Sequence, residues 1–260
     1  MMKIGICKMN PELLAETGCD YAELQFSKLA AMSEEDYQAI KQRHIELNIP
    51  ICATNGLLPS DVILSEREEL PDFGLTEFLE TGYRRLSELG GKYAVIGSGR
   101  ARNHAENESK QKGIERFARF VAFASDIARK FGIVNVVEEL NSAETNIVLT
   151  VSDANEIVEM AGKPENLAII ADFYHIAKED KVDSVKACAD RILHCHIANP
   201  ITRQVPVPND GSEDYYKVIF STLSEIGYNG GVSIEASAPN GAESYRESVE
   251  YLKKLAEEIK

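Results

Sequence analysis

Paired cysteines are missing from this chain of 260 residues. The five cysteines are scattered, and no two form a C-x-x-C or C-x-C pair, so the sequence predicts no thiolate zinc site. The five are Cys7, Cys19, Cys52, Cys188 and Cys195. Three of them lie in apolar runs, where cysteine behaves as a small buried hydrophobe. An odd, unpaired set favours a reducing compartment, so we expect a cytoplasmic protein.

Long apolar runs and an excess of basic residues are also absent. No run approaches the roughly 20 residues that a membrane-spanning helix needs, and the stretch MMKIGIC lacks the apolar core of a secretory signal. Lys and Arg number 28 against 42 Asp and Glu, which gives a net charge of −14. This charge opposes binding to duplex nucleic acid, because such binding depends on cations that neutralise phosphates. We therefore expect neither a membrane nor a nucleic acid partner.

Eight short runs rich in Val, Ile and Ala alternate with amphipathic stretches. The runs are 3–7, 21–26, 49–54, 93–99, 134–140, 167–173, 192–199 and 231–236. Helical patterns between or after them cover 33–47, 113–132, 151–162, 214–228 and 243–259. Eight strand–helix units in about 250 residues are typical of a (β/α)8 TIM barrel, so we predict one α/β domain over 1–260. A doubly wound open sheet is the main alternative, but no G-x-G-x-x-G follows the first run.

Polar side chains stand at the ends of the last four apolar runs. Glu138 ends VNVVE, Asp172 ends LAIIAD, His196 ends LHCH and Glu235 ends GVSIE. In a barrel these strand ends converge on one mouth, so three carboxylates and an imidazole would meet there. Carboxylates brought together repel one another unless protons or a cation compensate. Alone, each of these residues would be interpreted as a cap or a packed side chain; together they predict a four-ligand metal site.

Three oxygen ligands and one nitrogen ligand suit a hard or borderline divalent ion. Mn²⁺ fits best, and Mg²⁺, Co²⁺ and Zn²⁺ are the alternatives. His194 lies two residues before His196, on the same side of the strand but deeper in the barrel. We expect it to support or pack against His196 rather than to bind the metal.

Four segments resemble a known family. VVEELNSAETN (136–146), ADFYH (171–175), LHCHIANPITR (193–203) and YNGGVSIE (228–235) resemble the sugar isomerase/epimerase family with the xylose-isomerase-like TIM barrel. That family includes ketose 3-epimerases, hydroxypyruvate isomerases and inosose dehydratases. The resemblance implies a metal-dependent isomerase or epimerase of a small sugar or sugar phosphate, and many relatives are dimers or tetramers, so a homo-oligomer is also implied.

The resemblance assigns roles residue by residue. It makes Glu138, Asp172, His196 and Glu235 the metal ligands, and it makes Glu138 and Glu235 the pair that moves a proton through a metal-stabilised enediolate. It makes Glu139 an outward neighbour of the site. The substrate contacts that it implies are Glu144, His175 and Arg203. Arg203 lies one residue later than in the ketose 3-epimerases, so the segment NPITRQVPVPNDGSEDY (199–215) predicts a different substrate pocket.

Several alternatives stay open. In GSGRAR (97–102), Arg100 or Arg102 would bind a substrate phosphate, or both are solvated arginines of a tight turn. Glu23 would bind a sugar hydroxyl or serve as a buried structural carboxylate. An inosose-type dehydratase would use the same metal site. A zinc-dependent abasic-site endonuclease would need extra histidines where ATNG and GSGR stand, and a sugar-binding barrel without catalysis is the remaining alternative.

Overall fold

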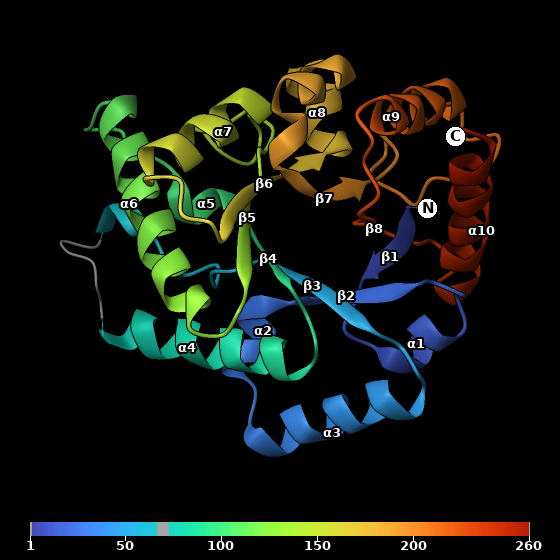
Figure 1. Cartoon of the computed structure of the whole chain (residues 1–260), viewed down its shortest axis with the longest axis horizontal. Coiled ribbons are helices and arrows are strands. Elements are labelled where there is room, and N and C mark those ends of the chain that lie inside the picture. Colours follow the sequence, from blue (N-terminus) through green and yellow to red (C-terminus); the bar gives the residue numbers. More distant parts are fainter. Residues whose placement is uncertain (1, 67–72, 260) are drawn as a thin grey trace.

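A closed barrel of eight parallel strands forms the centre of the molecule, and the helices lie outside it (Figure 1). The computed structural model describes residues 2–66 and 73–259. The strands are β1 (Lys3–Cys7), β2 (Tyr21–Gln25), β3 (Ile51–Asn55), β4 (Tyr93–Ile96), β5 (Val134–Val137), β6 (Leu167–Asp172), β7 (Ile192–Ile197) and β8 (Gly231–Ile234). Each strand pairs with its neighbours in chain order, and β8 pairs with β1. The predicted (β/α)8 fold is confirmed.

Helices connect the strands along the whole chain. They are α1 (Pro11–Ala15), α2 (Phe26–Ala31), α3 (Glu34–Glu46), α4 (Phe73–Glu88), α5 (Gly99–Arg102), α6 (Lys110–Arg129), α7 (Val151–Met160), α8 (Phe173–Glu179), α9 (Glu213–Glu225) and α10 (Ala242–Glu258), with 3₁₀ segments η1 (Leu64–Glu66) and η2 (Val182–Arg191). All five predicted helical stretches contain a helix. No helix in the described ranges combines the length and the apolar character that crossing a bilayer would need.

Side-chain caps fix where several of the helices begin. Ser33 precedes α3 and its hydroxyl accepts the Asp36 amide hydrogen at 3.1 Å. Thr150 and Asp153 form a reciprocal capping box at the start of α7. Such contacts satisfy amide groups that the helix itself leaves unpaired. The first turns are therefore set by local sequence, close to where the hydrophobic pattern predicts them.

The alternation of side chains along each strand separates two apolar layers. Outward residues of the strands pack against the helices in one large cluster, and inward residues fill the barrel in a second. The inner cluster consists of Val95, Val136, Ala168 and Ile170, which come from β4, β5 and β6. Because side chains repeat every two residues in a strand, Glu138 and Asp172 continue the same inward rows. On the side of β4, β5 and β6, the polar site thus lies above an apolar layer.

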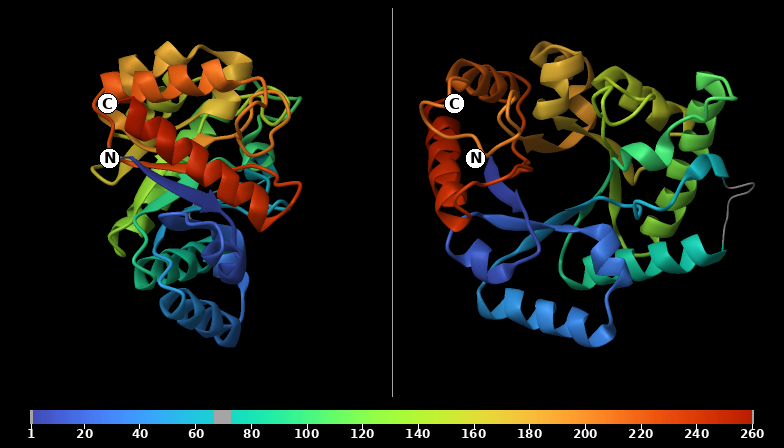
Figure 2. Two further views of the ribbon diagram at one scale, coloured as in Figure 1. Left: turned by 90° about the vertical axis from the view of Figure 1, so that its right-hand side faces the viewer. Right: turned by 180° about the vertical axis from the view of Figure 1, so that it is seen from behind.

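The two ends of the chain meet at the barrel wall. The last helix, α10, packs against β1, and Figure 2 shows this red helix running beside the blue first strand. Pairing of Gly5 with Ser233 and of Ile6 with Ile234 completes the hydrogen-bonded ring between β1 and β8. Closure fixes the relative positions of the eight strand ends, which is what a site built from several strands requires.

Candidate active site

The four predicted ligands meet at the carboxyl ends of the last four strands. Asp172 ends β6, His196 lies in β7, and Glu138 and Glu235 follow β5 and β8 directly. One ligand atom from each lies within 4.8 Å of the others. His196 Nδ1 is 3.3 Å from Glu138 Oε1, 3.6 Å from Asp172 Oδ2 and 4.0 Å from Glu235 Oε2. The structure therefore brings together the four side chains that the strand ends predicted.

The two carboxylate oxygens of Asp172 contact different groups. Oδ1 accepts the amide hydrogens of Tyr174 at 2.7 Å and His175 at 3.3 Å, and so caps α8. Oδ2 faces the cluster, 3.6 Å from His196 Nδ1. A strand-end carboxylate can thus be a helix cap and a cluster member at once. The cap also fixes the side-chain rotamer, so Oδ2 has little freedom to turn away.

Burial puts the charges of the cluster in conflict. Burial raises the pKa of Glu138 to about 7, the Glu235 carboxylate adds to this increase, and His196 opposes it. Burial works against a charged His196, but Glu23, Cys7 and Asp172 together outweigh it and raise the pKa of the imidazole. Burial likewise opposes ionisation of Asp172, yet His175 and His196 lower the pKa of this carboxyl group. Without a cation the cluster therefore holds protons that it would release when a cation binds.

His175 is fully buried beside the cluster rather than solvated in a loop. Its Nδ1 accepts the backbone amide hydrogen of Asn141 at 3.1 Å. An imidazole nitrogen that accepts from an amide carries no proton, so neutral His175 has its hydrogen on Nε2. That nitrogen has no hydrogen-bond partner among the described residues and lies 3.7 Å from Asp172 Oδ2. The structure thus leaves a buried donor unused at the edge of the site.

Arg203 joins two of the predicted residues. Its guanidinium contacts Glu144 Oε1 at 2.5 Å and Glu235 Oε2 at 3.2 Å, and it lies over the Tyr174 ring at 4.6 Å. Burial would lower the pKa of Arg203, but the Glu235 and Glu144 carboxylates outweigh it and raise the pKa. The backbone of Arg203 is left-handed, with φ of 55°. This turn brings the guanidinium back to the mouth of the barrel.

Asn55 is a site residue that the sequence interpretation overlooked. It ends β3 and donates from Nδ2 to Glu235 Oε1 at 2.7 Å. With Arg203 on Oε2, both oxygens of Glu235 accept a hydrogen bond. The signal was available, because Asn55 is a polar residue at the end of an apolar run, but only carboxylates and histidines were considered there.

Gly97 is a second overlooked residue, and its lack of a side chain is what matters. A Cβ atom built on Gly97 would lie 1.9 Å from Glu138 Oε2. Gly97 follows β4, the neighbour of β5, so the missing side chain leaves the space that the Glu138 carboxylate occupies.

Arg102 is not available as a phosphate ligand, which removes half of the phosphate alternative. It is 1% exposed, and its side chain donates to the carbonyl oxygens of Glu138 at 2.6 Å, Gly97 at 3.2 Å and Val148 at 3.0 Å. Burial lowers the pKa of Arg102 to about 10. This arginine fixes the backbone on both sides of the Glu138 site, whereas Arg100 is exposed.

Glu139 points away from the cluster but is not solvated. It is fully buried, and its Oε1 accepts the amide hydrogen of Asp172 at 2.7 Å. Burial, reinforced by the Asp172 carboxylate, raises the pKa of Glu139 well above its usual range. Glu139 thus connects the ends of β5 and β6 through its bond to the Asp172 amide. Because side chains alternate along a strand, Glu139 faces outward where Glu138 faces inward, as expected.

The residues present fit a divalent cation. The donor set is three carboxylates and one imidazole on atoms close enough to share one ion, and carboxylate oxygens with a histidine nitrogen suit hard and borderline ions. In the described part of the chain, one further group of ligand-type side chains comes as close: Cys7, Glu23 and His196. All five cysteines are free.

A closed (β/α)8 barrel with its polar cluster at the carboxyl ends of the strands has the layout of a TIM-barrel active site. The chain belongs to the xylose isomerase-like TIM barrel family, whose model matches residues 11–255. It is similar to 2-oxo-tetronate isomerase from Haemophilus influenzae, with 29% identity over 136 residues, which is 50% of each chain. The match therefore spans half the length of this curated relative.

Solved structures share the fold along the whole chain. 3-Keto-D-glucoside 4-epimerase from E. coli superposes with a TM-score of 0.82 and 22% identity, covering 98% of this chain and 100% of the other. D-allulose 3-epimerase from Methylomonas sp., solved in complex with D-allulose, superposes with a TM-score of 0.80 and 18% identity, covering 97% of this chain and 96% of the other. A D-psicose 3-epimerase solved in the presence of D-fructose superposes with a TM-score of 0.80 and 18% identity, with 99% of each chain covered.

Proposed function

We propose that this protein is a divalent-metal-dependent sugar isomerase or epimerase that moves a proton on a carbon next to a carbonyl group. The observation that carries the proposal is the gathering of Glu138, Asp172, His196 and Glu235 within 4.8 Å. Two of the four are glutamates from separate strands, as a reaction with one proton donor and one proton acceptor requires. Family membership and the names of the similar proteins support this chemistry.

The four cluster residues would hold the cation, and Mn²⁺ suits the donor set best, with Mg²⁺, Co²⁺ and Zn²⁺ as alternatives. When bound, a divalent cation withdraws electron density from a carbonyl oxygen and so makes the neighbouring C–H group more acidic. The protein side chains must then supply the base and the acid.

Glu235 is suited to take the proton. Asn55 donates to Oε1 and Arg203 to Oε2, and these two donors fix the orientation of the carboxylate. Glu138 enters the cluster from β5 and would return the proton to the carbon. If the two glutamates act on opposite faces of one carbon the product is an epimer, whereas one base that serves two carbons gives aldose–ketose isomerisation.

The substrate would lie between the cluster and the three predicted contacts. His175 would donate from its unused Nε2–H to a substrate oxygen. Arg203 and Glu144 would contact hydroxyl groups at the mouth, where both side chains are 36% exposed. Because Arg102 is fully engaged with carbonyl oxygens, Arg100 is the remaining phosphate candidate of GSGRAR, and we favour an unphosphorylated sugar over a sugar phosphate.

The test is a panel of ketoses, ketose phosphates and inososes incubated with Mn²⁺-loaded protein in D₂O and followed by NMR. We expect conversion of at least one ketose with solvent deuterium next to the carbonyl. Glu138→Gln and Glu235→Gln should keep the wild-type circular dichroism spectrum and lose at least about 100-fold in turnover. Full activity in either variant would remove that residue from proton transfer.

Other products would redirect the proposal. Loss of water from an inosose would identify a dehydratase, and nicking of an abasic-site duplex would identify an endonuclease. A metal-loaded protein that converts no sugar of the panel would favour the sugar-binding barrel without catalysis. Conversion without any solvent deuterium, for every substrate converted, would contradict a proton-transfer mechanism.

A further inference from the structure

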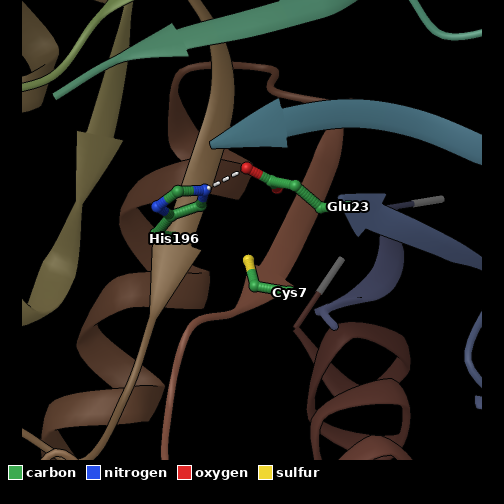
Figure 3. Close-up of side chains that lie close together, drawn as sticks. All are labelled: Cys7, Glu23 and His196. Carbon is green, nitrogen blue, oxygen red and sulfur yellow. Dashed lines mark hydrogen bonds and ion pairs between the residues drawn. The ribbon is translucent and has the colours of Figure 1, made fainter. Parts of the chain in front are cut away.

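A buried carboxylate lies directly beneath the candidate metal site. Glu23 projects from β2 into the barrel and faces His196 of β7, with Cys7 of β1 beside them (Figure 3). Glu23 and His196 are both 0% exposed. A buried carboxylate is costly unless hydrogen bonds satisfy it, so its partners show what it does.

Each oxygen of Glu23 faces a different imidazole. Oε1 lies 2.9 Å from His196 Nε2, and Oε2 lies 2.7 Å from His194 Nε2. A carboxylate can only accept, so both imidazole nitrogens must carry hydrogen. In a neutral His196 this leaves Nδ1 with a free lone pair, and Nδ1 is the nitrogen that faces Glu138, Asp172 and Glu235.

His194 holds the second oxygen in place. Its ring stacks on Tyr93, with centroids 6.0 Å apart and planes at 26°. Ser233 Oγ lies 3.2 Å from His194 Nε2 and 2.9 Å from Tyr21 Oη. Tyr93, Glu23 and Ser233 thus all contact the His194 ring. The Glu23 carboxylate therefore cannot rotate away from His196 without breaking its bond to His194.

We interpret the group of Cys7, Glu23 and His196 as support for the four-residue cluster and not as a second metal site, because the two groups share His196. A cation there would need His196 Nε2, which points at Glu23 Oε1. The same nitrogen cannot donate to a carboxylate and bind a cation. The geometry points instead to support of one site from below.

We propose that Glu23 is a positioning residue for the metal centre, with His194 as its anchor. By accepting the Nε2 hydrogen of His196, Glu23 fixes the tautomer and the ring orientation in which Nδ1 faces the cation. The carboxylate also makes the imidazole a stronger ligand, as outer partners of metal-bound histidines do. This inference rests on the proposed metal-dependent function.

Two substitutions separate the contributions of Glu23. Glu23→Met removes both acceptors at similar volume, so His196 Nε2 loses its partner. Glu23→Gln keeps one acceptor oxygen for His196 but turns an NH₂ group towards His194 and removes the charge. We expect the Mn²⁺ dissociation constant to rise about 100-fold for Glu23→Met and about 10-fold for Glu23→Gln.

The readouts are titration calorimetry with Mn²⁺ and thermal unfolding of the metal-free proteins in EDTA. Positioning predicts weaker Mn²⁺ binding in both Glu23 variants. Glu23→Met should also lower the metal-free Tm, because it leaves two buried imidazole N–H groups without an acceptor. Cys7→Ala is the matched control: it alters the same group but leaves both Glu23 oxygens in place, and its Mn²⁺ affinity should stay within about threefold of wild type.

The Mn²⁺ affinities of the Glu23 variants and of wild type separate a failed inference from a failed function. If both Glu23 variants bind Mn²⁺ like wild type, or if only their metal-free Tm falls, Glu23 is structural and the inference is wrong. If wild-type protein itself binds no Mn²⁺, Mg²⁺, Co²⁺ or Zn²⁺, the proposed function fails instead. Should Glu23→Met fail to fold, the isosteric Glu23→Gln decides the question alone.

Discussion

Gly97→Ala should damage the metal site although it changes no ligand. The added Cβ would lie 1.9 Å from Glu138 Oε2, whereas non-bonded atoms prefer roughly 3.5 Å. The obstacle is the end of a flexible side chain, so the carboxylate will move by about 1.5 Å and the backbone will stay. Arg102 holds the Glu138 carbonyl at 2.6 Å, which prevents the main chain from following.

The magnitudes expected for function and stability differ. A misplacement of about 1 Å at a reacting group can cost about 100-fold, so we expect turnover to fall at least about 100-fold and Mn²⁺ affinity at least about 10-fold. Overpacking costs about 1–3 kcal/mol, offset by about 0.4–1 kcal/mol because alanine restricts the unfolded chain. Gly97 has no positive φ, so alanine adds no backbone strain.

The assays are steady-state turnover on the identified sugar, Mn²⁺ calorimetry and thermal unfolding in EDTA. Gly82→Ala is the matched control, because its Cβ would lie 2.3 Å from Phe26 Cζ in the helix layer. That clash meets a buried ring, so it should lower Tm and leave Mn²⁺ affinity near wild type. If Gly97→Ala binds Mn²⁺ like wild type and turns over within threefold, the steric argument for Glu138 is refuted.

Three further predictions follow from the same geometry. Metal-free Glu138 has a pKa of about 7 and holds its proton below that pH, so a cation must displace the proton and the apparent Mn²⁺ dissociation constant should fall about tenfold from pH 6 to pH 8. Calorimetry in buffers of different ionisation enthalpy counts the protons released on binding. Release of no proton at pH 6 would contradict this prediction. Arg102→Met removes the Arg102 hydrogen bonds to three carbonyl groups, of which, among the described residues, only that of Val148 keeps another donor, the Leu140 amide. It should reduce the free energy of unfolding by about 2–4 kcal/mol, measured in urea; a selective loss of phosphorylated substrates would instead revive a phosphate role. Asn55→Ala frees one oxygen of Glu235 and should lower turnover at saturating Mn²⁺ by about 10- to 100-fold, whereas wild-type turnover would show that Arg203 alone suffices.

The fold could be predicted because its main signal is repeated eight times. Each apolar run overlaps one strand, and the barrel makes consecutive strand ends neighbours. The ends of the runs were less accurate: the run 93–99 contains β4 only to Ile96, because Gly97 and Ser98 leave the ladder. Ser98 has φ of 44°, a turn conformation that composition alone does not indicate.

Strand-end residues of the site could be predicted, but contacts across the barrel could not. Glu138, Asp172, His196 and Glu235 lie close together because of strand order alone. The contact of Glu23 with His194 joins residues 171 positions apart and depends on which side chains reach across the interior. Only the structure therefore decides between a sugar contact and a buried carboxylate for Glu23, and it favours the buried carboxylate.

Charge balance explains why such a cluster belongs to a binding site rather than to the interior of a stable barrel. The carboxylates at this end of the barrel are Glu23, Glu138, Asp172 and Glu235. Against them stand Arg203, which Glu144 also engages, and Arg102, which binds the Glu138 carbonyl oxygen. His196 is cationic only while it holds a second proton. Gathering like charges in a buried place lowers stability unless protons or a cation compensate. Protons compensate only below the pKa of each group, whereas a bound cation compensates at neutral pH. The free energy of unfolding should therefore rise as the concentration of free Mn²⁺ rises above its dissociation constant. A Tm that does not change with Mn²⁺ at pH 8 would contradict the proposed metal site.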